Sequence, residues 1–548
     1  MYGGLWGVLF SFFCAESISS LFPISRRSFV FFSTLVLSQE GLSSSLSLSS
    51  SLSLSFAPQI FYTFLSNKQT NEQTNERERE KMRNAPPAVQ QQQQGRGGGN
   101  AVGVLDAHYE KFASAMHRRD GELLATAVSV ECILRDCFNN NNNPPLSEND
   151  VKECKRRRSS SSSFSSSDRR VVPAPFDDVW EKLAMASLEL KRNAFEKCYD
   201  YHNEAMAFFI KDFKAREEPE DVIWTIKAMK RMTRDSRLCA EKADRNSRKV
   251  GKKATRLETC GAQLMQAYRC SSQTSTREKK LAQLKIVNEL FKIYFELNAL
   301  HLCKNLVNAV NLPTFLPFEE SFPSSEKVTY HFYVGRLAVF DDDYEGASEH
   351  LKYAFERCPK GSSKNKTACL KYLVPVMLSL GFVPSKKLFA KYKEALKPYE
   401  EVCEAVKTGK LGVLEQALER RKARFVREGT YLVFEKLRLY CLRTLFKKTS
   451  EIQKEFEPEK ANQVKLEMLS KACKIAAAVK SQHGNTANAS TNNNNKNLNN
   501  TDYDLDEVEC GISELIHRKF VKGYVSHKNR VVVLSKTDAF PKISDVVK

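Results

Sequence analysis

Apolar residues recur at helical spacing along most of this chain. The pattern begins near Val104 and continues with few interruptions to Val479. One stretch illustrates it, with apolar residues at every third or fourth position: Leu281, Leu284, Val287, Leu290, Phe291, Tyr294 and Leu297. This spacing places apolar side chains on one face of a helix. We therefore predict that the chain is built from stacked amphipathic helices.

The pattern changes near the C-terminus. A helix is predicted over 504–521, with an apolar face made of Val508, Ile512, Leu515, Ile516 and Phe520. We expect Gly523 to end this helix, because glycine tolerates positive φ angles. Two β-rich runs then predict a hairpin over 523–535. One helix and one hairpin cannot bury a core by themselves, so they must pack against a neighbouring element.

Three segments lack any apolar periodicity. Residues 1–100 are of low complexity and are predicted to be a disordered extension; residues 139–170 and the Asn-rich tract 480–502 are predicted to be disordered insertions. Met82 opens a segment typical of a natural start, so we interpret 1–81 as an upstream extension, the alternative being a targeting segment. The two apolar runs near the start are each shorter than the roughly 20 residues of a membrane span. We expect no membrane association.

Basic residues gather in the middle insertion. Lys155, Arg156, Arg157 and Arg158 form a short run similar to a nuclear-import signal, and the serines beside it could be phosphorylated. The alternative is a solvated basic loop.

The whole chain is strongly basic. It carries 85 Lys and Arg against 65 Asp and Glu, a formal net charge of +20, with a pI near 9.2. Such an excess favours acidic partners: RNA, DNA or an acidic protein. The alternative is a soluble protein with a solvated basic surface.

A basic patch is predicted within the later helices. Segment 386–397 has five lysines against one glutamate, and 420–427 has five cations and no acid. The candidate patch residues are Lys386, Lys387, Arg420, Arg421, Lys422 and Arg424. Phe389, Tyr392 and Phe425 lie among them, at a spacing that favours core packing over base stacking.

Signatures of catalysis and metal binding are missing from the sequence. Segment 250–256 contains Gly-Lys but lacks the upstream glycine of a phosphate-binding loop. The 15 cysteines include no CxxC pair, which suits buried thiols in a reducing compartment, and the nine histidines form no HExxH set. The acidic run 340–345 is interpreted as a solvated turn, the alternative being a metal or acid–base site. We expect no enzyme activity, cofactor or metal.

Residues 330–359 follow the tetratricopeptide pattern. Gly335, Ala347, Leu351, Ala354 and Pro359 occupy its small, apolar and terminating positions. Small residues allow paired helices to approach closely. The match predicts a right-handed stack of helix pairs, an architecture more common in scaffolds than in enzymes.

The C-terminal pattern completes a recognisable fold. A helix over 464–476, the helix 504–521 and the hairpin 523–535 together predict a winged helix. Placed after tetratricopeptide-like repeats, this resembles the PCI domain of proteasome-lid, signalosome and translation-initiation-factor subunits. Five segments resemble the PCI domain-containing protein 2 family, which includes the enhanced-ethylene-response and twelfth signalosome-like types: 327–358, 370–384, 427–439, 506–510 and 521–536.

The resemblance implies an all-α fold, a tetratricopeptide-like right-handed solenoid that ends in a winged helix. We assign N-terminal helical repeats to 101–326 and a PCI domain to 327–543. The PCI domain would comprise helical repeats over 327–449 and a winged helix over 457–536.

The resemblance also implies a function. The chain would be a non-enzymatic scaffold subunit of a nuclear complex that couples transcription to mRNA export, located in the nucleus and at its pores, with some in the cytoplasm. Its partners would be a large PCI scaffold, a small acidic peptide of the proteasome-lid kind, and RNA or DNA bound nonspecifically. The alternative is a signalosome-like or lid-like subunit that acts through protein contacts alone.

The winged helix supplies the candidate nucleic-acid contacts. Five cations follow its second helix or flank its hairpin: Arg518, Lys519, Lys522, Lys528 and Arg530. They would bind phosphates and provide affinity without sequence readout.

Overall fold

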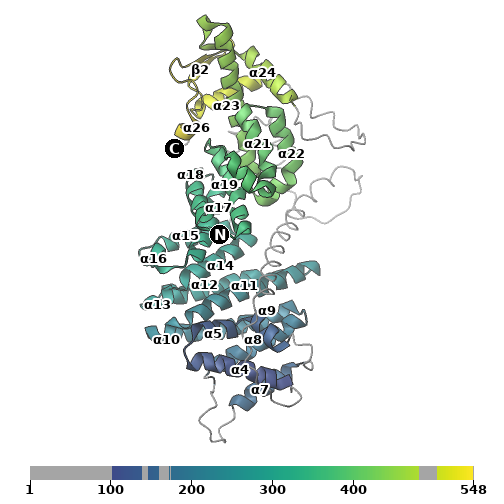
Figure 1. Ribbon diagram of the computed structural model, residues 1–548, viewed down its shortest axis with the longest axis vertical. Coiled ribbons are helices and arrows are strands. Elements are labelled where there is room, and N and C mark those ends of the chain that lie inside the picture. The colour runs from purple at the N-terminus through teal and green to yellow at the C-terminus, as the bar shows by residue number, and fades with distance from the viewer. Residues whose placement is uncertain (1–100, 139–145, 160–171, 173, 480–502, 547–548) are drawn as a thin grey trace, which may run out of the picture. The chain divides into compact units, whose positions relative to one another are not determined.

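The computed structural model describes residues 101–138, 146–159, 172, 174–479 and 503–546 (Figure 1). The predicted extension 1–100 and the Asn-rich tract 480–502 lie outside these residues. All described residues belong to one compact unit. None of the helices that the structure describes has the length and hydropathy needed to cross a bilayer.

The N-terminal half is entirely helical in its described residues. Its α-helices are α4 (Ala101–His117), α5 (Gly121–Ala127), α6 (Val130–Ile133), α7 (Glu148–Ser159), α8 (Phe176–Lys191), α9 (Phe195–Ala215), α10 (Pro219–Ile223), α11 (Ile226–Lys249), α12 (Arg256–Ser272), α13 (Arg277–Lys280), α14 (Gln283–Glu296), α15 (Leu300–Val310) and α16 (Phe318–Ser321). A π-helical turn, η1 (Leu134–Phe138), follows α6.

The C-terminal half adds a small sheet to further helices. Its helices are α17 (Ser324–Phe340), α18 (Tyr344–Arg357), α19 (Ser363–Ser379), α20 (Lys386–Lys391), α21 (Lys393–Thr408), α22 (Leu411–Glu428), α23 (Tyr431–Phe456), η2 (Pro458–Lys460), α24 (Leu466–Ala478), α25 (Leu505–His517) and α26 (Ile543–Val546). Its strands are β1 (Gln463–Lys465), β2 (Gly523–Ser526) and β3 (Val531–Leu534).

Consecutive helices pack as pairs, as the repeat pattern predicted. In the pair α17 and α18, a Cβ on Gly335 would lie only 2.7 Å from the Leu351 Cγ atom, so the two helices meet at this glycine. Ala347, Leu351 and Ala354 are fully buried. The tetratricopeptide-like architecture is confirmed.

Buried apolar residues form two clusters along the chain. The first runs from Leu105 to Leu337 and includes large, fully buried side chains such as Trp180. The second runs from Val339 to Leu534, so it unites the later repeats with the winged helix. The predicted apolar stripe lies on α14, where Leu284, Val287 and Leu290 are fully buried.

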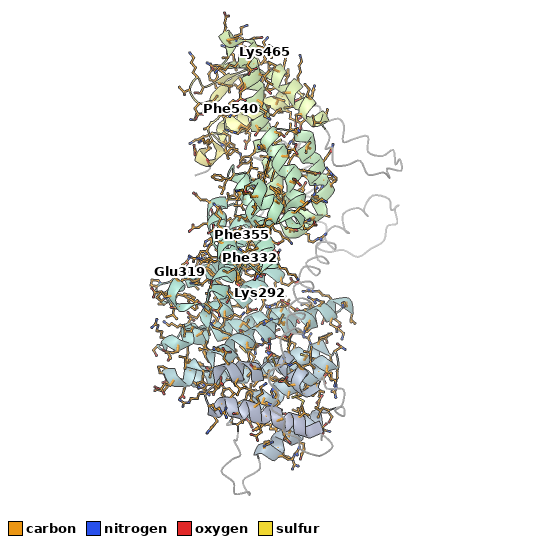
Figure 2. All side chains as sticks on the ribbon, viewed as in Figure 1. Lys292, Glu319, Phe332, Phe355, Lys465 and Phe540 are labelled. Carbon is orange, nitrogen blue, oxygen red and sulfur yellow. The ribbon has the colours of Figure 1, made fainter. Side chains whose placement is uncertain are left out.

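A buried ionic network joins α11 to α14. The carboxylate of Glu289 has no solvent exposure and lies 2.6 Å from Arg237, 2.8 Å from Lys285 and 3.0 Å from Lys292, which Figure 2 labels. Burial alone would raise the pKa of Glu289, but these three cations hold it well below its usual range. The network therefore keeps a charged group stable inside the helical stack.

In its described residues the winged helix has three strands, whereas the sequence predicted only a hairpin. The order is β1-β3-β2, all antiparallel, with Val464 opposite Val532 and Val525 opposite Val532 on the other side. Residues 464–465, predicted as helix, belong to β1. A three-residue strand has no periodicity of its own, and it forms only because β3 supplies hydrogen-bonding partners from a distant segment.

The last helix of the winged helix ends earlier than predicted. Helix α25 stops at His517, and Lys519 with φ of 62° makes the left-handed turn expected of Gly523. Gly523 instead begins β2, where a Cβ would lie 2.3 Å from the Val533 carbonyl oxygen. Gly523 therefore allows β2 to approach β3 closely.

The predicted disordered insertion 139–170 contains a helix, α7, so that prediction was wrong for 148–159. Val151 and Cys154 are fully buried, and α7 packs on α4 and α8. Two apolar residues are too few to reveal a helical period. The rest of the insertion lies outside the described residues, apart from 146–147.

Candidate nucleic-acid interface

The winged helix is attached to the repeats through α23. Arg443 on α23 donates a hydrogen bond of 3.1 Å to the Phe520 carbonyl and a second to the Pro541 carbonyl. The Tyr440 ring packs at 5.2 Å from the Phe520 ring. These contacts hold the turn after α25, where most of the candidate cations lie.

Arg530 is the candidate cation that faces two carboxylates. Its guanidinium lies 2.7 Å from Asp506 and 2.8 Å from Glu509, both on α25. Hydrogen bonding to Asp506, with that to Glu509, raises the pKa of Arg530 above its usual value. His527 also contacts Glu509, at 2.8 Å. Arg530 therefore fastens the hairpin to the helix.

Two more candidate cations also face carboxylates. Arg518 lies 2.5 Å from Glu514 in the preceding helical turn, and Lys522 lies 3.1 Å from Asp538. Lys519 and Lys528 are exposed and form no ion pair with any residue that the structure describes. Among the five candidate cations, these two can therefore meet phosphates without displacing a carboxylate that the structure describes.

The acidic partners could have been found from the sequence. Asp506 and Glu509 are three residues apart and share a face of α25, and Glu514 precedes Arg518 by four residues. The sequence could not show that α25 packs against the hairpin and so brings Arg530 close to Asp506 and Glu509. That arrangement is visible only in the tertiary structure.

The second predicted patch also contains both cations that face carboxylates and cations that do not. On α22, Arg420 and Arg421 both bind Glu401, at 3.2 and 2.6 Å. Lys422 lies 3.6 Å from Glu419, and Arg424 lies 3.2 Å from Glu428. The cations of α22 therefore belong to internal ion pairs.

The aromatic residues among these cations pack inward. Phe425 is fully buried, with its ring 4.5 Å from that of Phe434. Phe389 and Tyr392 pack against the second core cluster. The predicted preference for core packing over base stacking is confirmed.

A group of lysines without a carboxylate partner among the described residues lies on α20 and the first turns of α21. Lys386 and Lys387 were predicted, and three further lysines accompany them. All five side chains are exposed, and none forms an ion pair within the described part of the chain: Lys386, Lys387, Lys391, Lys393 and Lys397. We call this group the α20–α21 lysine cluster. Sequence reasoning counted these lysines but included only the first two in the patch.

The import-like run is part of the folded helix α7. Lys155 binds Asp177, Asp178 and Glu181, all on α8. Arg158 binds Asp106 and Glu110 on α4. These two side chains hold α7 against its neighbours.

The other two residues of the run bind within α7. Arg156 lies 2.9 Å from Glu153, and Arg157 lies 3.5 Å from the same carboxylate. An import receptor would have to compete with all of these ion pairs.

The described residues contain no group of three or more His, Cys, Asp or Glu side chains arranged to hold a metal ion. The acidic run 340–345 contains the exposed turn 341–343 between α17 and α18, in which Asp343 caps α18 by accepting a hydrogen bond of 2.9 Å from the Gly346 amide. Burial raises the pKa of the Cys303 and Cys441 thiols to about 12, so neither is a ready nucleophile. Cys510, in contrast, is exposed.

Comparison with known proteins places two family models on this chain. The model described as PSMD3-like, N-terminal TPR repeats, matches residues 252–403, and that of the PCI domain matches 414–536. PCI domain-containing protein 2 of Xenopus laevis is 34% identical over 384 residues, which is 69% of this chain and 87% of the relative. The chain belongs to the PCI domain-containing protein 2 family.

Other relatives agree with this family. Enhanced ethylene response protein 5 of Arabidopsis thaliana is 36% identical over 336 residues, 61% of this chain and 74% of the relative. Protein CSN12 homolog of Neurospora crassa is 30% identical over 297 residues, 52% of this chain and 61% of the relative. The predicted family and fold are confirmed.

Family membership also defines the general role. PCI-domain proteins are generally non-catalytic scaffold subunits of multi-subunit complexes, and neither matched model describes an enzyme. The PCI model covers α22 to β3, the part of the chain that carries the winged-helix cations and the α22 patch.

Proposed function

We propose that this chain is a non-catalytic scaffold subunit of a nuclear complex that couples transcription to mRNA export. In this role it binds a large PCI-domain partner, a small acidic peptide and, without sequence preference, RNA or DNA. Membership of the PCI domain-containing protein 2 family and the net charge of +20 support this proposal. It is found in the nucleus and at its pores, with some in the cytoplasm.

The observation that carries nucleic-acid binding is the α20–α21 lysine cluster. Its five ammonium groups have no carboxylate partner in the described residues, so phosphates need not displace an internal ion pair. Contacts of this kind supply affinity that falls steeply with salt and is independent of base sequence. Lys519 and Lys528 of the winged helix supply a second, smaller set.

The test compares charge reversals in three places. The cluster variant is Lys386→Glu, Lys387→Glu and Lys393→Glu, and the wing variant is Lys519→Glu and Lys528→Glu. A matched control, Lys197→Glu, Lys211→Glu and Lys407→Glu, changes by the same charge as the cluster variant three exposed lysines on α9 and in the last turn of α21. Arg530 is left unchanged, because a glutamate there would face Asp506 and Glu509 and disturb the hairpin.

The readout is the affinity for unrelated single-stranded RNA and duplex DNA oligonucleotides over a range of salt concentrations. The cluster variant should bind all of them more weakly, with a salt slope smaller by roughly one for each phosphate that its side chains no longer bind. The affinity of the control should fall only by the smaller amount that its lower net charge causes. The wing variant should show a smaller loss of the same kind. Equal binding by the cluster variant, the wing variant and the control would remove nucleic acid from the proposed function.

A second candidate function rests on a different observation. Arg518, Lys522 and Arg530 all face carboxylates, which suits a winged helix that contacts only other PCI subunits. The Protein CSN12 homolog among the relatives carries a signalosome-type name. Affinity purification separates the two candidates: co-elution of pore and export factors supports the first, and of lid-type or signalosome subunits the second.

A further inference from the structure

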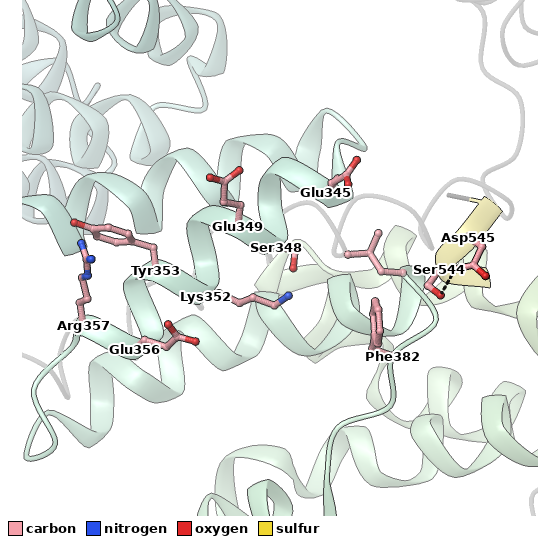
Figure 3. A pocket seen from close by; sticks show the side chains of 11 residues that line it. Glu345, Ser348, Glu349, Lys352, Tyr353, Glu356, Arg357, Phe382, Ser544 and Asp545 are labelled. Atoms are coloured by element: carbon pink, nitrogen blue, oxygen red, sulfur yellow. Dashed lines mark hydrogen bonds between the residues drawn. The ribbon is translucent and has the colours of Figure 1, made fainter. Parts of the chain in front are cut away.

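A groove lies between α18 and the C-terminal end of the described chain (Figure 3). It has a volume of 780 Å³. One wall is a face of α18, and the other is formed by the segment after α19 and by α26. The lining residues are Glu345, Ser348, Glu349, Lys352, Tyr353, Glu356, Arg357, Leu380, Phe382, Ser544 and Asp545.

The second wall depends on how the C-terminal segment docks. Gly381 has φ of 82°, and a Cβ there would lie 2.8 Å from the Ile543 Cβ, so α26 rests directly on this glycine. The segment before α26 is held by the hydrogen bond from Arg443 to the Pro541 carbonyl. A second hydrogen bond, of 2.8 Å from the Lys522 amide to the Ala539 carbonyl, also holds this segment. The groove is therefore a formed part of the fold.

The groove is acidic although the whole chain is basic. Glu345, Glu349 and Glu356 lie along α18, and Asp545 on α26 lines the same groove. None of these four carboxylates forms an ion pair with a residue that the structure describes. Of the two cations in the groove, Arg357 already lies 3.4 Å from Glu319, outside it. The local charge is therefore available to a cationic ligand.

An apolar side chain lies beside these carboxylates. Phe382 is 48% exposed, and the neighbouring Leu380 is half-buried. Figure 3 shows Phe382 across the groove from the α18 side chains. A purely ionic site would not need such a residue, whereas a peptide with an apolar side chain would gain from covering it.

We propose that this groove docks a basic segment of a partner protein, with its lysines or arginines facing the glutamates of α18 and an apolar residue covering Phe382. Glu345 and Glu356 are about 16 Å apart along the helix axis. An extended segment of about five residues spans that length. Nucleic acid is a poor occupant because its phosphates would meet the carboxylates. This proposal does not depend on nucleic-acid binding elsewhere in the chain.

The test uses the full chain and a defined probe, a fluorescent twelve-residue peptide of alternating lysine and leucine. The groove variant is Glu349→Lys with Glu356→Lys. The matched control, Glu435→Lys with Glu455→Lys, reverses two exposed glutamates that form no ion pair within the described residues. We expect anisotropy titrations to show about tenfold weaker binding for the groove variant and a change of less than about twofold for the control. None of the four positions is buried, so unchanged thermal transitions should accompany both variants.

A second variant tests the apolar contact. Phe382→Ser should weaken binding of the lysine–leucine peptide by a few fold and leave binding of a lysine–glycine peptide unchanged. Equal losses for both peptides would show that Phe382 acts only through the shape of the groove, which overturns the apolar part of the proposal.

Three results would overturn the proposal as a whole. Wild-type affinity of the groove variant for the lysine–leucine peptide would show that the peptide binds elsewhere. Preferential binding of a glutamate–leucine peptide would show that the occupant is acidic. Self-association of the wild type that the groove variant abolishes, measured by sedimentation, would assign the groove to a second copy of this chain.

Discussion

Buried histidines show how strongly single residues depend on their environment in this protein. The Nδ1 atom of His108 accepts a hydrogen bond of 3.1 Å from the Trp180 indole. His202 is fully buried, and neither of its ring nitrogens has a hydrogen-bond partner among the described residues. Burial lowers the pKa of each histidine to about 4. Both are therefore neutral in the folded protein at neutral pH.

Acid should destabilise the fold through these histidines. An unfolded histidine titrates near pH 6.5, so between about pH 6.5 and 4 the unfolded chain binds protons that the folded chain excludes. Stability is complete above this window and is lost as the pH falls through it, by at most about 3 kcal/mol for each histidine.

Urea unfolding between pH 7 and 5 measures this loss. His202→Leu should reduce the pH dependence, while the exposed His117→Gln should leave it unchanged. An unchanged slope in His202→Leu would show that His202 does not contribute.

Arg443 is a second residue whose role comes from its position. It is buried and joins α23 to the turn after α25 and to the C-terminal segment through two carbonyl groups. Arg443→Met should keep the side-chain volume but leave both carbonyls without this donor, which costs about 2 to 4 kcal/mol.

Hydrogen exchange measures this local effect. Amides of 536–546 should exchange faster in Arg443→Met, and the exposed Arg427→Met is the matched control. Slow exchange in 536–546 would mean that packing alone holds the segment.

At the scale of elements, close approaches between helices decide how the winged helix joins the repeats. Gly412 in the first turn of α22 lies against the end of α24, where an added Cβ would be 2.1 Å from the Ala477 carbonyl oxygen. Helix α23 packs on both of these helices. The junction therefore requires a glycine on α22.

Gly412→Ala should weaken this junction. The methyl group would meet backbone atoms that cannot rotate away, so α24 must shift, at a cost of about 1 to 3 kcal/mol. In contrast, Gly103→Ala on α4 has open space around the new methyl group and should be neutral or slightly stabilising. Thermal unfolding of both variants tests the difference, and equal transition temperatures would contradict the required close approach.

At the scale of the whole molecule, charge is distributed unevenly. The cations of α22 and of the winged helix are mostly paired, the α20–α21 lysine cluster is not, and the groove beside α18 carries an excess of carboxylates. The net charge of +20 is therefore a sum over surfaces of different charge and does not give the charge of any one of them. Acidic and basic ligands have different places to bind.

Binding of the proposed acidic peptide should depend on salt. A disordered acidic segment that folds onto the repeats would pair with exposed lysines, and salt screens such pairs. The affinity of a synthetic acidic peptide should fall between low and high ionic strength, and Glu349→Lys with Glu356→Lys should not weaken it. Affinity that is constant with salt would show that apolar contacts dominate.

The amino-acid sequence by itself determined the repeats, the winged helix and the family. Helical periodicity and the small residues of a repeat, such as Gly335 and Ala347, are local signals, because each helix needs only its own apolar face to be recognised. The tertiary structure determined that β1 and α7 form and which of the candidate cations are paired with carboxylates. Val464 pairs with Val532, Lys155 with Asp178, and Arg530 with Asp506, all from segments that periodicity treats separately. Which lysines stay free for a ligand depends on which carboxylates the fold brings beside them, and that is a property of the packed chain.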